Sequence, residues 1–521
     1  MESGTAPRVS EAVNGAGANG SGAERIEVLN PATGATIDSI AVDSPASIAE
    51  TVARVRANQA AWEALGIEGR YYWLGRLRDW ILDNTEQIAD TMQAETGKVR
   101  ADISLDLVYV ADLINFYGKN AAKYIGDETV RPHSPLLAAK KLLVQYRPHP
   151  VVGVISPWNF PLAMGLGDSI PALQAGAAVV VKPSEFTPLS LIEVVKAWKE
   201  EIGAPDVFDC VLGTGEAGST LIDHVDYVQF TGSDRTGRKV MGRAAETLTP
   251  VSLELGGKDP MIVLADADID RAANAAAWGG MVNSGQLCIS VERIYVEEPA
   301  YDEFVAKLTA EVGRLRQGAD GRKPEKDVGA MTSPNQSAVV EDHVNDALAA
   351  GARALTGGRK GDGPGDYFEP TVLVDVDHSM KVMRDETFGP VVGVMKVRDS
   401  EQALELANDT RYGLAASVFG EKGRAEKVAR RIEAGSVNVN DVIINMAALG
   451  VPMGGWKGSG IGARHGEYGI KKYCRPESIV VTRFGGKREP NWFPYTKSRR
   501  GLVGRVSRAF GARDWRRRLG L

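Results

Sequence analysis

The chain has 521 residues, of which 44% are hydrophobic and 25% charged, and its net charge is −6. These values are typical of soluble globular proteins, and the length predicts two or three domains rather than a single core. No apolar run reaches the roughly 18 residues of a membrane span, and the first residues lack the features of a secretory signal. The acidic balance of the chain gives no indication of nucleic-acid binding.

Residues 1–23, rich in Gly, Ala and Ser, are expected to form a disordered leader. Residues 46–65, 68–95 and 100–125 are predicted to be helices, because apolar residues recur in them at three- and four-residue steps. An alternating stretch near 142–150 predicts a strand or ribbon.

Short apolar runs follow, separated by segments long enough for helices. They are VVGVIS (151–156), AAVVVK (177–182), CVLG (210–213), YVQFT (227–231) and VSLEL (251–255). Runs that are apolar on both faces predict a parallel sheet of βαβ units. From about residue 257 a second series of strands and helices begins, at 260–264, 268–281, 289–298 and 300–315, which predicts another α/β domain.

The charge is unevenly distributed. From Lys487 onward there are eleven Lys/Arg and two Asp/Glu, a balance of +9, so the rest of the chain carries −15. Within residues 498–521 four apolar residues recur at helical spacing with arginines between them: Leu502, Val503, Val506 and Phe510. Two interpretations stay open: an amphipathic helix that makes a weak contact with an anionic membrane surface, or a tail that is solvated or lies on the acidic body of its own oligomer.

Cys288 lies in SGQLCIS, where a polar, glycine-bearing turn enters an alternating run. A packing thiol usually sits inside an apolar pattern, whereas loop-to-strand positions often carry working side chains. Glu254, in VSLELGGKDP, ends a predicted sheet strand and is followed by Gly256 and Gly257. Burial there would raise its pKa toward the range of a general base, although a surface-facing glutamate is an equal alternative.

Two prolines bracket Trp158, Asn159 and Phe160 in ISPWNFPL, so the turn fixes the direction of one side-chain amide. An amide N–H aimed at a developing negative charge is one half of an oxyanion hole. The simpler interpretation is a tight turn that fills a core.

Three further stretches are candidates for a nucleotide site. Lys182 and Glu185 follow a buried strand at the edge where doubly wound sheets bind nucleotides. A carboxylate there can accept both ribose hydroxyls and would repel a 2′-phosphate, so Glu185 favours NAD over NADP. Gly232 and Ser233, in GSDRTG, precede a predicted helix whose N-terminus suits a phosphate. In DETFGPVV, the Glu386 carboxylate and the Phe388 ring are suited to a ribose and a flat ring. Simpler interpretations stay open for all three stretches: an acid that complements a helix start, an ordinary strand–turn–helix junction, and a loop entering a strand.

Together these stretches resemble the aldehyde dehydrogenase superfamily. The matching segments are PWNFP, KPSEFTP, FTGSDRTG, ELGGK, GQLCIS, ETFGPV and PMGGWKGSGIG, in the family's order and spread over roughly residues 25–485. The resemblance implies that Cys288 is the nucleophile, that Asn159 and the Cys288 N–H stabilise the oxyanion, and that Glu254 activates water to release a thioester. It also implies NAD or NADP as cofactor and no metal.

The resemblance implies a set of cofactor-binding residues: Ser156, Pro157, Trp158, Lys182, Glu185, Gly232, Ser233, Gly256, Glu386 and Phe388. It further implies an α/β fold with a Rossmann-type cofactor domain (24–128 and 147–256) and a second α/β catalytic domain (257–456). A β-arm (129–146 and 471–486) would join subunits into dimers or tetramers, and residues 487–521 would form a basic C-terminal tail.

The aldehyde itself stays open. The succinate-semialdehyde dehydrogenases are the main alternative, but MGLGDSIP (164–171) lacks the arginine that carboxylated substrates commonly require, and Arg293 is expected to point elsewhere. An uncharged aldehyde is therefore favoured. The expected tunnel wall comprises Met164, Gly165, Asp168, Leu287, Ile289 and the 445–450 loop.

The remaining cysteines and histidines carry little chemistry. Three cysteines far apart in the sequence argue against a disulfide framework and favour a reducing, cytoplasmic compartment. The six histidines show no HxxxH or HxH spacing, which is typical of proteins without a zinc site. His465, in GARHGEYG, is expected at a surface or an interface.

Overall fold

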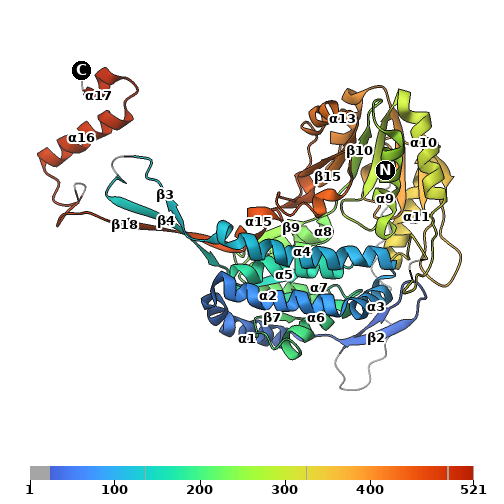
Figure 1. The fold of residues 1–521 in the computed structure, drawn as a ribbon, viewed down its shortest axis with the longest axis horizontal. Helices are drawn as coiled ribbons and strands as arrows, with labels where there is room; N and C mark the ends of the chain where they lie inside the picture. The colour runs from blue at the N-terminus through green and yellow to red at the C-terminus, as the bar shows by residue number, and fades with distance from the viewer. Residues whose placement is uncertain (1–23, 135–136, 324, 490–491, 520–521) are drawn as a thin grey trace, which may run out of the picture.

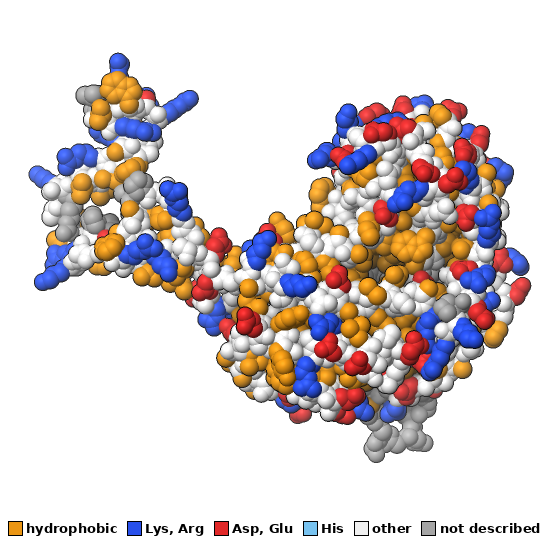
Figure 2. All heavy atoms as spheres, in the orientation of Figure 1, with side chains coloured by type: hydrophobic (Ala, Val, Ile, Leu, Met, Phe, Trp, Pro, Cys, Tyr) orange, Lys and Arg blue, Asp and Glu red, His pale blue; other side chains and the backbone are white. Residues whose placement is uncertain are grey.

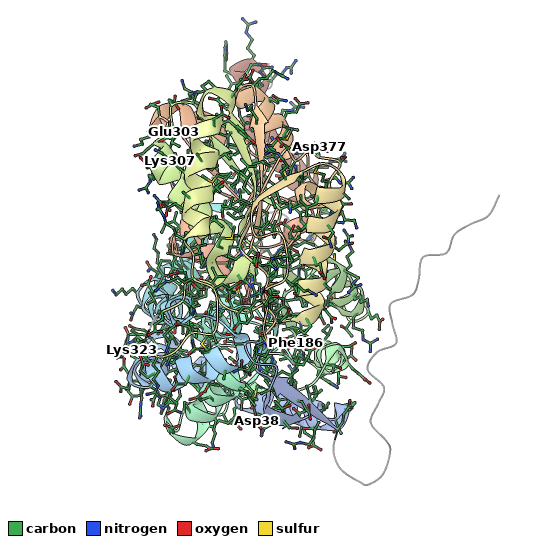
Figure 3. The ribbon with its side chains drawn as sticks, turned by 90° about the vertical axis from the view of Figure 1, so that its right-hand side faces the viewer. Asp38, Phe186, Glu303, Lys307, Lys323 and Asp377 are labelled. Carbon is green, nitrogen blue, oxygen red and sulfur yellow. The ribbon has the colours of Figure 1, made fainter. Side chains whose placement is uncertain are left out.

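A computed structural model describes residues 24–134, 137–323, 325–489 and 492–519, so the expected leader at 1–23 lies outside the described residues. The molecule has two stacked lobes and an arm that projects from the lower lobe (Figure 1). In the side view, Asp38 lies at the foot of the lower lobe, and Glu303, Lys307 and Asp377 lie in the upper lobe (Figure 3).

The lower lobe is built on a six-stranded sheet in the order β17-β9-β8-β5-β6-β7. Its strands are β5 (Val151–Ile155), β6 (Ala178–Lys182), β7 (Phe208–Cys210), β8 (Tyr227–Thr231), β9 (Val251–Glu254) and the short antiparallel β17 (Gly460–Ile461). Four of the five apolar runs are thus confirmed as parallel strands, whereas the run at 210–213 shares only Cys210 with β7, which begins earlier at Phe208. Strand order reverses between β5 and β8, which is where doubly wound sheets bind their ligands.

Helices cover both faces of this sheet. They are α1 (Pro45–Ala64), α2 (Gly66–Asp83), α3 (Thr85–Thr96), α4 (Arg100–Ile125), α5 (Pro161–Ala175), α6 (Leu189–Glu200), α7 (Gly215–His224) and α8 (Asp234–Ala245). The prediction of one helix over 68–95 is wrong. Asn84 leaves the helical conformation at φ −108° and its side-chain amide donates to the Trp80 carbonyl at 2.9 Å, as an asparagine at a helix end commonly does.

The upper lobe holds a seven-stranded sheet in the order β12-β13-β14-β11-β10-β15-β16, in which only β12 is antiparallel. The strands are β10 (Asp259–Val263), β11 (Val291–Glu297), β12 (Arg353–Thr356), β13 (Thr371–Val374), β14 (Val391–Val397), β15 (Ala415–Phe419) and β16 (Ser436–Val439). Its helices are α9 (Ile269–Met281), α10 (Glu298–Gly313), α11 (Pro334–Ala349), α12 (Lys381–Arg384), α13 (Ser400–Asn408) and α14 (Lys422–Ala429). The predicted second α/β series is confirmed.

The arm is a separate antiparallel sheet of β3 (Glu128–Val130), β4 (Lys140–Pro148) and β18 (Cys474–Thr482). A hairpin of β1 (Arg25–Leu29) and β2 (Thr36–Ala41) lies at the foot of the lower lobe. Beyond the arm the chain forms α16 (Lys497–Gly511) and α17 (Trp515–Leu519), which lie away from both lobes (Figure 1). None of the described helices combines the length and apolar character needed to cross a membrane.

The core of the lower lobe is centred on α5, every residue of which is buried. This helix begins at Pro161, directly after the Trp158–Phe160 turn, and packs against α4. Because α5 cannot shift without opening the core, the turn at its N-terminus is held rigidly.

Candidate active site

A central cavity of about 590 Å³ lies between the carboxyl ends of β5, β8 and β9 in the lower lobe and the loops that lead into β11 and β14 in the upper lobe. Most of the predicted site residues line it: Pro157, Trp158, Asn159, Gly232, Ser233, Glu254, Gly256, Cys288, Glu386 and Phe388. Ser156, Lys182 and Glu185 do not line the cavity and instead lie at the carboxyl ends of β5 and β6. Three strand-to-loop junctions of the lower lobe and two loop-to-strand junctions of the upper lobe therefore bring together residues spread over more than 200 positions of the sequence.

Cys288 lies between the short helix η2 (Val282–Gly285) and β11, half-buried and facing the cavity. The loop before it has three consecutive residues with positive φ: Asn283 at 51°, Ser284 at 56° and Gly285 at 68°. Non-glycine residues there cost of order 1–3 kcal/mol each, which the surrounding contacts must offset. A Cβ on Gly285 would lie 2.0 Å from the Gly389 carbonyl oxygen, so only glycine fits.

Hydrogen bonds join this loop to the Asn159 turn. The Nδ2 atom of Asn283 donates to the carbonyls of Gln286 and Asn159, both at 3.1 Å. Asn159 Nδ2 donates to the same Gln286 carbonyl at 2.9 Å. An amide nitrogen carries two protons, so the second Asn159 N–H is left for a group in the cavity.

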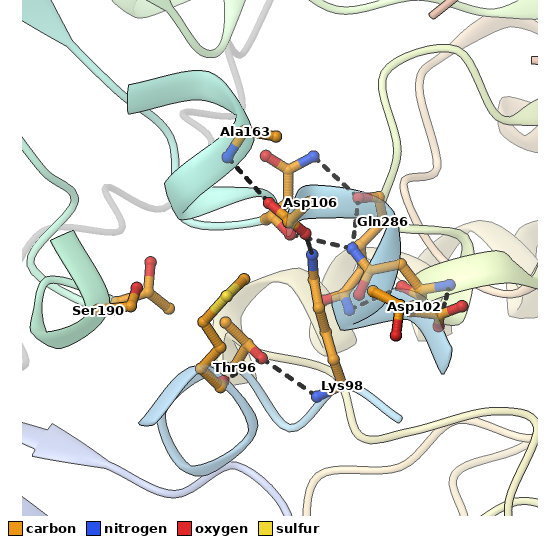
Figure 4. A network of polar contacts seen from close by, with 12 residues as sticks. Thr96, Lys98, Asp102, Asp106, Ala163, Ser190 and Gln286 are labelled. Carbon is orange, nitrogen blue, oxygen red and sulfur yellow. Dashed lines mark hydrogen bonds and ion pairs between the residues drawn. The ribbon is translucent and has the colours of Figure 1, made fainter. Parts of the chain in front are cut away.

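A buried polar network braces both segments from behind (Figure 4). Lys98 Nζ pairs with Asp106 at 2.9 Å, and both side chains are 0% exposed. The other Asp106 oxygen accepts the Ala163 N–H at 2.9 Å, in the first turn of α5. Asp102, one turn earlier on α4, accepts the Asn283 N–H at 2.9 Å. One helix face therefore holds both the α5 N-terminus and the cysteine loop.

The thiol of Cys288 is in its neutral form at neutral pH. Burial raises its pKa to about 12, and the nearby carboxylates of Glu386 and Glu254 act in the same direction, while Arg464 opposes them. The thiolate is the reactive nucleophile, so the site must remove a proton before or during attack.

Glu254 is 2% exposed at the end of β9. Burial raises its pKa to about 7, although the positive charges of Arg464 and Lys472 lower it. The nearest Arg464 nitrogen lies 3.9 Å from Oε2, and Oε1 is buried with no hydrogen-bond partner among the described residues. A carboxylate with this pKa and a free oxygen beside a cavity is suited to accept a proton from water.

Beneath Glu254, Arg464 makes a two-point contact with Asp168, at 3.0 Å to Oδ1 and 2.7 Å to Oδ2. Lys472 approaches the same carboxylate at 3.6 Å. The next residue, His465, is 1% exposed and its Nε2 lies 3.0 Å from the Tyr109 hydroxyl, so the expectation of a surface or interface histidine is wrong. Burial lowers its pKa to about 3, which keeps the ring neutral.

The loop that carries Glu386 and Phe388 is fixed by Glu292. The Glu292 carboxylate accepts the backbone N–H groups of Thr387 and Phe388, both at 2.9 Å, and pairs with the buried Lys258. Phe388, at φ 51°, then places its ring edge-to-face with Trp158 at a centroid separation of 5.4 Å.

Glu386 itself accepts the Gly257 N–H at 2.9 Å. Its carboxyl group also packs directly against Gly256, where a Cβ would lie only 2.3 Å from Glu386 Oε2, so a larger residue would clash. Burial raises its pKa to about 8, with the Glu292 charge acting in the same direction. A carboxyl group in this state can both donate to and accept from a hydroxyl pair.

The carboxyl edge of the six-stranded sheet fits a dinucleotide. Ser156 Oγ, at the switch point, is buried without a hydrogen-bond partner among the described residues. Lys182 Nζ lies 3.1 Å from Glu185, whose side chain is 32% exposed and accessible to a ribose. Ser233 caps α8 by accepting the Thr236 N–H at 3.3 Å, so the first turn of that helix faces the same edge.

The outer part of the cavity is apolar. Four apolar lining residues are more than 40% exposed and form what we term the apolar rim: Leu105 (43%), Val108 (67%), Trp278 (45%) and Ile444 (51%). Figure 2 shows hydrophobic side chains gathered in the hollow between the lobes, over α4 and α9. Exposed apolar groups clustered at a cavity mouth indicate a surface that binds an apolar ligand.

Most of the expected tunnel wall is confirmed: Met164, Leu287, Ile289, Met446, Ala447 and Leu449 line the cavity. Gly165 and Asp168 do not, because both lie inside α5 with neighbours on the protein side: a Cβ on Gly165 would lie 3.0 Å from Leu191. Arg293 is fully buried and donates to the carbonyls of Lys258 and Ala407, so it points elsewhere as expected.

The chain matches the family model described as "Aldehyde dehydrogenase family" over residues 18–479. It is 40% identical over 481 residues to the 4,4'-diapolycopene aldehyde oxidase of a Methylomonas species, which covers 91% of this chain and 89% of that protein. A Mycolicibacterium smegmatis protein, provisionally named as an NADP(+) succinate-semialdehyde dehydrogenase, is 40% identical over 87% of each chain. Among solved structures, lactaldehyde dehydrogenase from Escherichia coli has a TM-score of 0.85 at 34% identity, covering 88% of this chain and 96% of that one.

Proposed function

Because the chain belongs to the aldehyde dehydrogenase family and is an NAD(P)-dependent aldehyde dehydrogenase, we propose that it oxidises apolar aldehydes to carboxylic acids through an adduct on Cys288. The observation that carries this proposal is the central cavity, which joins Cys288, Glu254 and Asn159 to the apolar rim. The proposal assigns the first three residues to catalysis and the rim to substrate selection.

In the proposed reaction, the Cys288 thiol releases its proton to water, its sulfur forms a bond to the aldehyde carbon, and the electron pair of the C=O π bond moves to the oxygen, which gains negative charge. The free N–H of Asn159 Nδ2 donates to that oxygen, and its fixed orientation supports this role because both ends of the turn are braced. A bound nicotinamide cofactor would supply the hydride acceptor, and loss of hydride from the adduct carbon would leave a thioester on Cys288. Glu386 and Phe388 would hold the cofactor ribose and ring at the cavity.

Glu254 would then remove a proton from a water molecule that attacks the thioester, releasing the acid and restoring the thiol. A pKa of about 7 supports this role, because a base is most effective when its pKa lies near the working pH. The unpaired Oε1 supplies the accepting atom.

The substrate class follows from the rim and from the charges beside it. Among the described cavity-lining residues, the only cation is Arg464, and its charge is taken up by Asp168 and Glu254. The lining acids Asp112 and Asp441 would repel a carboxylated aldehyde. Both observations favour a long or bulky apolar aldehyde over succinate semialdehyde, whereas the 40% identities to proteins named for a 4,4'-diapolycopene aldehyde and for succinate semialdehyde do not separate the two.

The decisive experiment compares acetaldehyde, decanal and succinate semialdehyde by the absorbance of the reduced nicotinamide. We expect the highest kcat/KM with decanal. Val108→Glu should lower it about tenfold or more, since burying a valine-sized side chain contributes ~1.5–3 kcal/mol, and should leave acetaldehyde unaffected. Leu82→Glu, at a residue 52% exposed on α2, is the matched control. Higher kcat/KM with succinate semialdehyde would refute the apolar class while leaving the enzyme class intact.

We also propose NAD as the preferred cofactor, because Glu185 would accept the adenosine ribose hydroxyls and repel a 2′-phosphate. For the arm we propose a role in self-association. Strand β18 is an edge strand of nine residues whose outer residues Val480 and Val481 are 58% and 44% exposed. A long, apolar open edge is suited to pairing with a second copy of the chain.

A further inference from the structure

The C-terminal tail, here residues 492–519, has no part in the chemistry proposed above and differs in charge from the rest of the chain. Helix α16 carries five Lys/Arg and no acid, and α17 adds three consecutive arginines. Figure 2 shows this segment as a mixture of basic and hydrophobic side chains held at a distance from both lobes. A segment with this composition is suited to bind a partner other than the aldehyde or the cofactor.

From Arg500 onward, the apolar and basic side chains of α16 lie on separate faces. At ~100° per residue, Leu502, Val503, Val506 and Phe510 fall within a sector of about 100°. Four of the five basic residues, Lys497, Arg500, Arg505 and Arg508, fall in the sector opposite, and the fifth, Arg499 in the first turn, falls in the apolar sector. The structure leaves the apolar face open, since Leu502, Val503 and Phe510 are 43%, 48% and 51% exposed.

We propose that this tail docks on an anionic phospholipid surface, with the apolar face of α16 among the acyl chains and the arginines at the headgroups. A helix with one apolar and one basic face suits this position, because both faces are then satisfied. Trp515, 63% exposed on α17, adds a side chain that favours the membrane–water boundary. The long arginine side chains can reach the headgroups from a shallowly buried helix.

Other occupants satisfy only half of this surface. The acidic body of the enzyme or a nucleic acid could neutralise the arginines but would leave the apolar face in water. A second copy of α16 could cover the apolar face but would bring two sets of arginines together. Within the described part of the tail, the ion pair of α17 is local, between Arg517 and Asp514 in the turn before the helix.

The test uses the full-length enzyme and vesicles of phosphatidylcholine, with or without phosphatidylglycerol, in a sedimentation assay. We expect binding to the anionic vesicles, little binding to neutral ones, and release by salt. Arg505→Gln with Arg508→Gln should weaken binding about thirtyfold, at ~1 kcal/mol for each arginine. Val503→Ser with Phe510→Ser should also weaken it, whereas Leu248→Ser, at a residue 89% exposed on the body, should not.

Several results would overturn the proposal. One is equal sedimentation with neutral and anionic vesicles, or none with either. Another is a Val503→Ser, Phe510→Ser protein that binds vesicles normally but changes its oligomeric state, which would assign the face to a second copy. Tight binding of a duplex oligonucleotide by both the unchanged enzyme and the Val503→Ser, Phe510→Ser protein would assign the tail to nucleic acid. Vesicle binding needs no turnover, so its failure is distinguishable from failure of the proposed function, and acetaldehyde oxidation should be unchanged in all tail variants.

Discussion

The buried pair of Lys98 and Asp106 offers a sharp test of how the site is held. Asp106→Asn keeps the shape of the side chain but removes its charge, and it leaves the Lys98 ammonium buried without a carboxylate. Removing one partner of a buried ion pair costs about 3–5 kcal/mol, which is roughly a hundredfold to several thousandfold in the folded-to-unfolded ratio. This cost applies to Lys98 and Asp106 because both side chains are 0% exposed and their charged atoms lie 2.9 Å apart.

The assay is the apparent midpoint of urea unfolding, with a matched pair on the surface. Glu303 and Lys307 lie on one face of α10 at 2.8 Å, and the Glu303 side chain is 59% exposed (Figure 3). Glu303→Gln should therefore cost only ~0.3–0.5 kcal/mol. Adding Lys98→Met to Asp106→Asn should recover part of the loss, because no unpaired charge then remains.

Catalysis should fall together with stability in the Asp106→Asn protein. The lost charge also weakens the acceptor of the Ala163 N–H, and that bond fixes the start of α5 just after Asn159. We expect kcat to fall at denaturant-free conditions where the protein is still folded. If Asp106→Asn costs no more than Glu303→Gln, the view that this pair braces the site is wrong.

The remaining predictions concern the chemistry. Because the Glu254 pKa is raised to about 7, its base form appears above that pH, and kcat should rise as the pH increases through about 7. Arg464→Met removes a charge that lowers this pKa and should move the rise to higher pH by about one unit or more, whereas Asp168→Asn should move it lower. Glu254→Gln should reduce kcat by about 10²–10⁴-fold and let an acylated Cys288 peptide accumulate for mass spectrometry. Glu185→Gln should raise kcat/KM with NADP relative to NAD, and an unchanged ratio would count against its proposed role.

The strands of the lower lobe could be predicted because each is apolar on both faces. YVQFT is a strand over the same five residues, Tyr227–Thr231, and the switch point after it follows from the order of the runs. Helix ends were harder to predict, since the break at Asn84 depends on a single side chain within a continuous apolar pattern. Local periodicity reports which face is buried, and it reports turns only where glycine or proline marks them.

The residues that line the cavity could be predicted because their motifs join strands to loops. The supporting residues could not. Asp106 lies in the middle of a helix and Asp168 in the middle of another, and a single acid at such a position is usually solvated. A signal did exist, since Asp102 and Asp106 are one turn apart on the face of α4 that carries Ile103 and Val110, both buried. Only the tertiary structure shows that Lys98 and backbone N–H groups meet them.

The cluster beneath Glu254 explains how one carboxyl group can be fully buried and still work as a base near neutral pH. Burial alone favours the protonated form, which could not accept a proton from water. Arg464 and Lys472 favour the ionised form, but two unopposed cations would make Glu254 a weak base. Asp168 takes up part of their charge, at 2.7 Å from Arg464 and 3.6 Å from Lys472. Asp168 is one anion against the two cations, so ionisation of Glu254 makes the cluster neutral. This net attraction lowers the Glu254 pKa while burial raises it, and together they place it at about 7.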